Sequence, residues 1–213
     1  MFDYDAHVKL TAQVRLLPDP AQETALRATL DLTNQTANLV SEVAWQRSVF
    51  RNFDLRKITY GQVRAKGLSA QPAQHVIKKV ADAYKTDRRT KRTFRADAAQ
   101  PYDDRCLSWQ PDQHTVSIWT IAGRLKGLRF TLGEHQQALL AHRKGESDLL
   151  CRDGKWYLYA TCEAPEAPQT SPAGFLGADL GIEVLTSFCA RLDGRRFARN
   201  RAERALRYAE RST

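Results

Sequence analysis

The sequence predicts an α+β chain in which a helical segment interrupts a β-rich one. Two observations lead to this prediction. Apolar residues recur at helical spacing from about residue 19 to about residue 100, whereas they alternate as in strands before residue 18 and beyond about residue 105. With 213 residues, 42% of them hydrophobic, the chain can bury a core in one large domain or two small ones.

The N-terminal part predicts one strand and one long helix. Lys9 to Leu17 alternates loosely, as a strand does. Asp19, Pro20 and Gln22 then supply an N-cap acceptor, a proline for the first turn and a capping-box partner, so a helix should run from here to about Val49. Its apolar stripe consists of Leu26, Leu30, Ala37, Val40 and Ala44.

Two more helices are expected before the spacing of apolar residues changes from helical to alternating. One begins after Asp54 and ends near Gly67, and the next follows Ser69 as its N-cap. The second of them has the clearer apolar stripe, and Lys78 and Lys79 lie off it. The stripe consists of Ala73, Val76, Ile77, Val80, Ala81 and Tyr84.

Beyond residue 105 the pattern predicts paired strands. Thr115 to Thr120 and Leu125 to Leu132 flank a turn at Gly123. Leu149 to Arg152 and Lys155 to Glu163 flank Asp-Gly at 153 and 154, a dipeptide that favours tight hairpins because both turn residues need positive φ. We expect a β-hairpin there.

A second domain is expected after a linker. Residues 164–172 contain Pro165, Pro168 and Pro172 and few large apolar residues, which is typical of a linker. The domain boundaries are therefore set at 1–163, 164–172 and 173–213, with the helical insert at about 19–100. Within the last part we expect strands at 175–180 and 185–192 and an arginine-rich helix at 199–211.

Basic residues concentrate in two segments. The chain has 33 Lys and Arg against 24 Asp and Glu, a net charge of +9. Residues 47–95 hold 14 basic and 3 acidic residues, and residues 191–213 hold 8 and 3. An excess gathered in this way predicts a polyanionic partner, because phosphate contacts need clustered cations.

The stretch from Lys85 to Arg95 is a candidate phosphate-tracking arm, with Phe94 available to stack on a base. A solvated helix end or loop is the plainer interpretation of the same residues. Arg124 and Lys126, beside the turn at Gly123, are weaker candidates. The predicted nucleic-acid-binding residues are Lys78, Lys79, Lys85, Arg88, Arg89, Lys91, Arg92, Arg124 and Lys126.

Other kinds of site find little support in the sequence. The four cysteines form no C-x-x-C pair and give no zinc signal. His75, like His114, His135 and His142, lacks a partner at fixed spacing and is expected to be a surface or core residue. No apolar run approaches the roughly 20 residues that span a bilayer, and the N-terminus lacks the layout of a signal peptide. A cytoplasmic protein with reduced thiols is expected.

One motif carries possible catalytic chemistry. In Leu176 to Ile182, Asp179 closes a short apolar strand and Gly181 follows two residues later. An aspartate on a buried strand is costly unless it is paired or bound to metal, and the glycine permits close approach of a metal and a phosphate. An ordinary turn is the common alternative for such a motif.

Several of these stretches together resemble the TnpB family, also called OrfB-type insertion-sequence transposases, which are compact relatives of type V CRISPR effectors. They occur in the family's order and cover nearly the whole chain. The matching stretches are Leu10 to Pro18 with the following helix through Asn38 and Trp45, residues 68–71 leading into 76–84, Ala122 to Arg124, Asp148 to Glu163, and Leu176 to Ile182.

The resemblance implies a wedge-like β-barrel with an inserted helical recognition region, followed by a RuvC nuclease domain of RNase H-like fold. Family members are transposon-encoded, RNA-guided DNA endonucleases. They hold a guide RNA from the transposon end and pair it with target DNA beside a short motif. Asp179 matches the first RuvC carboxylate, which is a ligand of divalent metal, usually Mg²⁺.

The departures from the family lower the expected activity. Its site also needs a later glutamate and a further aspartate, and it carries a zinc ribbon with two C-x-x-C pairs, none of which is found in these 213 residues. Ala178 stands where the family usually has valine. We therefore expect a truncated nuclease, with an incomplete RuvC-like domain, that cannot cleave DNA alone. The alternatives are a non-catalytic RNA- or DNA-binding regulator and a decayed reading frame.

Overall fold

The computed structural model describes residues 7–166, 176–179, 187–192 and 195–198. The chain divides into two compact units, Met1–Glu166 and Ala167–Thr213, and the boundary falls within residues 164–172. The helices and strands of the first unit are β1 (His7–Leu17), α1 (Pro20–Arg47), α2 (Asn52–Ala65), α3 (Ala70–Thr86), β2 (Gln100–Tyr102), β3 (Leu107–Gln110), a 3-10 turn (Pro111–Gln113), β4 (Thr115–Thr120), β5 (Gly123–Thr131), α4 (Glu134–Leu140), β6 (Arg143–Arg152) and β7 (Lys155–Pro165).

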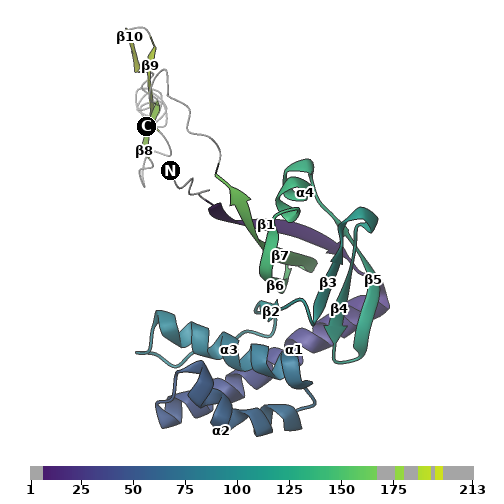
Figure 1. Ribbon diagram of the computed structural model, residues 1–213. Coiled ribbons are helices and arrows are strands. Elements are labelled where there is room, and N and C mark those ends of the chain that lie inside the picture. Colours follow the sequence, from purple (N-terminus) through teal and green to yellow (C-terminus); the bar gives the residue numbers. More distant parts are fainter. Residues whose placement is uncertain (1–6, 167–175, 180–186, 193–194, 199–213) are drawn as a thin grey trace, which may run out of the picture. The chain divides into compact units, whose positions relative to one another are not determined.

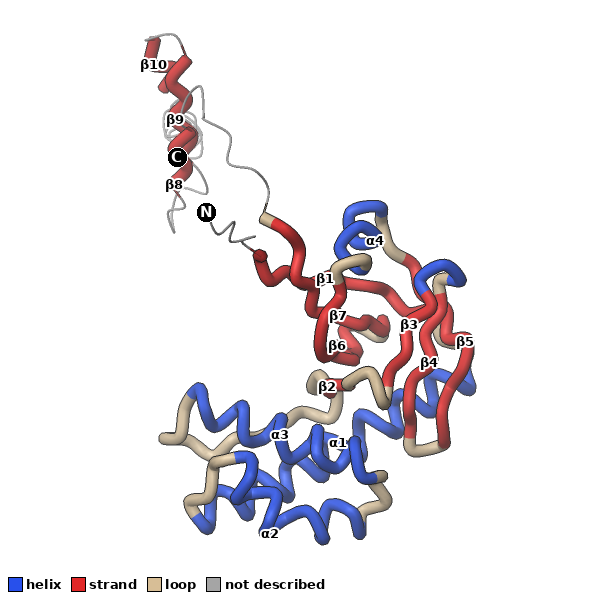
Figure 2. Tube along the Cα trace, viewed as in Figure 1, coloured by secondary structure: helices blue, strands red, loops and turns tan. Residues whose placement is uncertain are grey.

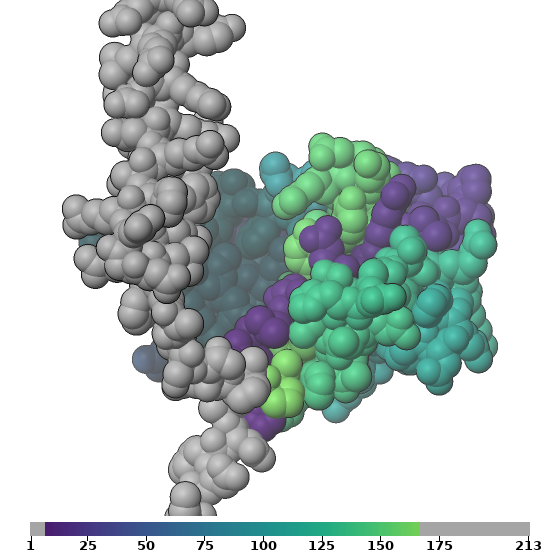
Figure 3. All heavy atoms as spheres, turned by 90° about the horizontal axis from the view of Figure 1, so that it is seen from above, coloured from purple at the N-terminus to yellow at the C-terminus, as the bar shows by residue number. Residues whose placement is uncertain are grey.

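The seven strands of this unit form one antiparallel sheet that curls into a nearly closed barrel (Figures 1 and 2). The strand order is β2-β6-β7-β1-β5-β4-β3. Strand β1 pairs with β7 from His7 opposite Pro165 to Arg15 opposite Tyr157, and the space-filling view shows the two strands together at the surface (Figure 3). The edge strands β2 and β3 are consecutive in the chain, so residues 103–106 join the two edges of the sheet.

Helices α1, α2 and α3 are inserted between β1 and β2 and gather on one side of the sheet (Figure 2). At about 1.5 Å per residue, the 28 residues of α1 reach roughly 42 Å. Leu26 and Leu30 near its start belong to the barrel core, whereas Ala37, Val40 and Ala44 belong to the core of the helices. One helix therefore takes part in both cores. The predicted barrel-like sheet with an inserted helical segment is confirmed.

Local sequence signals explain the ends of these elements. The Asp19 side chain accepts from the Gln22 N–H at 2.8 Å, and the Gln22 side chain accepts from the Asp19 N–H at 3.1 Å, so the predicted capping box is present. The predicted β6–β7 hairpin is also present: Asp153 and Gly154 have φ values of 50° and 71°. The second helix begins at Asn52, slightly earlier than predicted.

In the first unit, three short elements besides the 3-10 turn were not predicted. Strands β2 and β3 have three and four residues, and α4 has seven, too few for a sequence period to emerge. Leu139 and Leu140 of α4 are nonetheless buried in the barrel core. Tertiary contacts, rather than local pattern, therefore determine these elements.

The second unit contains an antiparallel sheet of three short strands, ordered β10-β9-β8. They are β8 (Leu176–Asp179), β9 (Ser187–Leu192) and β10 (Arg195–Ala198). The first two fall within predicted strands, whereas β10 was not predicted. The predicted helix at 199–211 lies outside the described residues, and the RNase H-like assignment stays a prediction.

Candidate nucleic-acid interface

The predicted arm, Lys85 to Arg95, begins on α3 and continues as an extended segment along α1. We call residues 92–98 the strap, because three polar side chains from one face of α1 hold their backbone. Asn34 donates to the carbonyls of Ala96 (2.8 Å) and Ala98 (2.9 Å), Asn38 bonds the N–H (2.8 Å) and carbonyl (2.9 Å) of Phe94, and Ser41 donates to the carbonyl of Arg92 (2.5 Å). The C-terminal end of the arm is therefore fixed on α1 through its backbone.

Most cations of the arm already have partners. The ion pairs are Lys85 with Asp82 (2.6 Å), Lys91 with Glu42 (2.6 Å), Arg92 with Asp87 (3.1 Å) and Arg95 with Asp97 (3.6 Å). The hydrogen bond to Glu42 raises the pKa of Lys91. The Arg88 guanidinium lies 5.9 Å from the centre of the Phe50 ring. Arg89 is exposed, and its side chain has no partner within the described residues. The Phe94 ring packs against the helical core instead of standing free.

Lys78 and Lys79 on α3 are held by the protein as well. Lys78 pairs with Glu146 of β6 at 2.8 Å and with Asp82 at 3.3 Å. Lys79 donates to the Asn34 side chain at 2.5 Å, and its ammonium lies 5.1 Å from the centre of the Phe94 ring. Desolvation lowers the pKa of Lys79 to about 8, against a partial opposing effect of Asp148. Lys78 therefore connects α3 to β6, and Lys79 connects α3 to α1.

Arg124 and Lys126, both on β5, differ from each other. The Arg124 guanidinium donates to the hydroxyls of Ser108 (3.4 Å) and Ser117 (3.3 Å) and to the Arg105 carbonyl, so it ties β5 to the neighbouring edge of the sheet. Lys126 is exposed, and its ammonium has no partner among the residues described. Of this pair, Lys126 is the one free to meet a phosphate.

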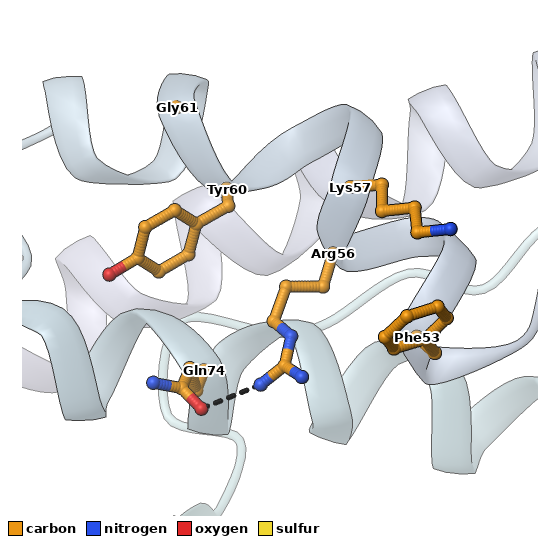
Figure 4. A pocket seen from close by; sticks show the side chains of 6 residues that line it. All are labelled: Phe53, Arg56, Lys57, Tyr60, Gly61 and Gln74. Carbon is orange, nitrogen blue, oxygen red and sulfur yellow. Dashed lines mark hydrogen bonds between the residues drawn. The ribbon is translucent and has the colours of Figure 1, made fainter.

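A face of α2 that was not singled out in the sequence has the features of a binding surface. Phe53, Arg56, Lys57, Tyr60 and Gly61 of α2, with Gln74 of α3, line a shallow hollow of about 440 Å³, which we call the α2 hollow (Figure 4). Its volume is within the range of small-ligand sites. Phe53 is 60% exposed, and the Lys57 ammonium lies 4.4 Å from the centre of its ring.

The cations of α2 and of the residues that flank it are not neutralised. Residues 47–67 contain six basic residues and one acidic residue, Asp54. Arg56 donates to the neutral Gln74 amide at 2.7 Å, and Arg64 donates to the Leu68 carbonyl at 2.6 Å. In the described part of the chain, none of these six cations forms an ion pair with a carboxylate. The uncompensated charge of the helical insert therefore lies in residues 47–67, which include α2, more than on the arm.

The outward side of β1 and β7 offers a second candidate surface. Tyr157 and Tyr159 project from β7 with ring centres 6.5 Å apart, and both are half-buried. Arg15 lies opposite Tyr157 on β1, and Gln13 lies opposite Tyr159. Aromatic faces beside a cation can stack on bases, so this surface resembles α2 in chemistry. The alternation of residues 155–163 could have indicated it.

Asp179, the candidate catalytic and metal-binding residue, is the last residue of β8 and pairs with Ser187 of β9 in register. Its side chain lies beyond what the structure describes. No protein-family model and no curated protein matches the chain. Among the helices described, none is long and apolar enough to cross a membrane.

Proposed function

We propose that residues 7–166 bind single-stranded segments of RNA, as part of an RNA-guided DNA endonuclease of the TnpB/OrfB transposase type. The observation that carries the proposal is the α2 hollow, which is lined by the exposed ring of Phe53 and by Arg56 and Lys57, two cations without a carboxylate partner. A base stacks on such a ring while neighbouring cations bind its phosphates. Loops and ends of a folded guide RNA expose their bases in the required way.

The guide RNA, the DNA target and the metal are proposed from the resemblance to the TnpB family. The RNA is a guide from the transposon end, and the target is DNA that pairs with it. Mg²⁺ is the implied metal, with Asp179 as one of its ligands. Two metal ions need several carboxylates, and the described residues supply one of the family's set. The proposal for this 213-residue chain is therefore RNA binding and not cleavage.

RNA binding can be tested by its dependence on salt. The probe is a mixed-sequence, single-stranded RNA of about 30 nucleotides, and the variant is Arg56→Gln/Lys57→Gln. For single strands, each phosphate contact contributes about 0.7 to the slope of log K against log salt. If both cations bind phosphates, the slope falls by about 1.4. Phe53→Ala should weaken binding by about 1–3 kcal/mol, the usual contribution of base stacking, and leave the slope nearly unchanged.

A matched control is Lys85→Gln/Lys91→Gln, which removes the same charge from residues that are ion-paired in the arm. Its slope should change by much less than that of the α2 variant. Equal effects of the two variants would show that only total charge matters and would refute the α2 assignment. A flat salt response of the unmodified protein would refute nucleic-acid binding itself.

A non-catalytic RNA- or DNA-binding regulator is the second candidate function. The supporting observation is that the α2 hollow lies wholly in the first unit, whereas Asp179 lies in the second. With Mg²⁺, guide RNA and matching DNA, the 213-residue polypeptide should bind without cleaving. Cleavage that disappears in Asp179→Ala would contradict the regulator and would show that this chain is itself a nuclease.

A further inference from the structure

Residues 103–106 join β2 to β3, the two edge strands of the barrel, and α3 lies beside this loop. Three chemically different donor groups meet there: the imidazole of His75, the carboxylate of Asp103 and the thiol of Cys106. His75 comes from α3, whereas the other two come from the loop. The cluster therefore joins three parts of the first unit, namely α3 and both edges of the sheet.

The donor atoms are spaced as ligands of one small cation would be. All three lie within 4.8 Å of one another, and the His75 Nε2 is 3.4 Å from the Asp103 Oδ2. In tetrahedral zinc sites the bonds are about 2.0–2.3 Å long, which places neighbouring ligand atoms roughly 3.3–3.8 Å apart. Shifts of about 1 Å or less would bring the remaining distances into this range.

The two loop residues are held by backbone bonds. One oxygen of Asp103, Oδ1, accepts from the N–H groups of Arg105 (3.1 Å) and Cys106 (3.2 Å). This leaves the other oxygen, Oδ2, to face His75. The Gln71 amide nitrogen lies 2.5 Å from this oxygen and 3.2 Å from the His75 Nε2, so the amide has to turn away when a cation binds. Arg105 in turn donates to Gln71 at 3.2 Å. The carboxylate is thus oriented by its neighbours before any cation binds.

The exposure and the chemical types of the three ligands favour zinc. His75 and Cys106 are each only 4% exposed, whereas the Asp103 side chain is 25% exposed, so solvent reaches the cluster from the carboxylate side. A cation can enter from that side and keep a water as its fourth ligand. Imidazole and thiolate suit zinc, whereas Mg²⁺ prefers oxygen ligands throughout.

We propose that His75, Asp103 and Cys106 bind one Zn²⁺ ion that fastens α3 to the closing edges of the barrel. On binding, the Cys106 thiol releases its proton to solvent, and the charges of the thiolate, the carboxylate and the metal then sum to zero. The spacing of cysteines and histidines along the chain does not indicate this site, because the fold, and not a C-x-x-C motif, brings these residues together.

The test uses the full chain, freed of metal by a chelator and titrated with Zn²⁺ by calorimetry or with Co²⁺ by absorption spectroscopy. We expect one equivalent to bind, with a thiolate-to-cobalt charge-transfer band and visible bands of tetrahedral intensity. In Cys106→Ala the charge-transfer band should vanish, and affinity should fall by more than the roughly 10- to 100-fold typical of lost outer-shell partners. Cys151→Ala, on β6, should bind like the unmodified protein.

Thermal unfolding provides a second readout that does not depend on the absorption spectrum of the bound metal. Zn²⁺ should raise the melting temperature of the unmodified chain and of Cys151→Ala, and it should not raise that of Cys106→Ala or His75→Gln. Circular dichroism checks that each variant folds. If the unmodified chain binds no stoichiometric metal, or if Cys106→Ala binds it equally well, the cluster is a hydrogen-bonded anchor and the zinc site is refuted.

Discussion

The strap gives a prediction whose magnitude follows from the hydrogen bonds. Asn38→Ala removes the side chain that bonds both the N–H and the carbonyl of Phe94, at 2.8 and 2.9 Å. Two such bonds contribute about 1–3 kcal/mol of net stability. Alanine recovers about 0.5 kcal/mol through its higher helix propensity. The expected net loss in the free energy of unfolding is therefore about 0.5–2.5 kcal/mol.

Urea denaturation followed by circular dichroism measures this loss. Limited trypsin digestion then locates it, because the arm has six basic residues and should become the first site of cleavage once the strap detaches. Gln35→Ala is the control: this residue is exposed on the same helix, so its stability should change by less than about 0.5 kcal/mol. An Asn38→Ala variant with unchanged stability and unchanged protease protection would refute the view that α1 holds the strap.

Two further predictions concern glycine and a buried lysine. Gly154→Ala should lower the free energy of unfolding, measured by urea denaturation, by about 1–2 kcal/mol, because Gly154 has φ +71°. Gly61→Ala, at an open position inside α2, should instead raise it by about 0.5–1 kcal/mol. Equal effects of the two substitutions would contradict this reasoning. Lys79→Met should raise stability most near neutral pH. The pKa of Lys79 is about 8 in the folded chain, against 10.5 ordinarily. Between pH 8 and pH 10.5 the unfolded state therefore binds more protons than the folded state, so the wild type becomes more stable relative to the variant as the pH rises through this range. At about 1.36 kcal/mol per pH unit, the advantage of the variant should shrink by at most about 3 kcal/mol, and a pH-independent difference would show that Lys79 is not desolvated.

Long elements with strong local signals could be predicted from the sequence. The capping box at Asp19 and Gln22 marks the start of α1 because the cap satisfies backbone donors within four residues. The Asp-Gly turn sets the β6–β7 hairpin in the same local way. The burial of Leu139 and Leu140 depends instead on where the barrel places α4, and seven residues carry too little pattern to predict that.

The candidate sites were harder to predict because they depend on partners distant in the chain. Lys91 is paired with Glu42, 49 residues away, and Lys78 with Glu146, 68 residues away. A count of charges along a segment includes such cations at full value. It cannot show that a carboxylate from another element compensates them. The cluster of His75, Asp103 and Cys106 could not be predicted for the same reason, because the fold brings together residues from distant positions in the chain.

Charge in the helical insert therefore has to be assessed by pairing instead of by number. The arm and α2 both contribute to the basic segment 47–95, yet only the cations of α2 stand beside an exposed aromatic ring without carboxylate partners. A bound phosphate must compete with Glu42 for Lys91, whereas at Arg56 and Lys57 it replaces only a neutral amide, a ring and water. Because less has to be displaced there, α2 is the face on which a nucleic-acid backbone should bind first.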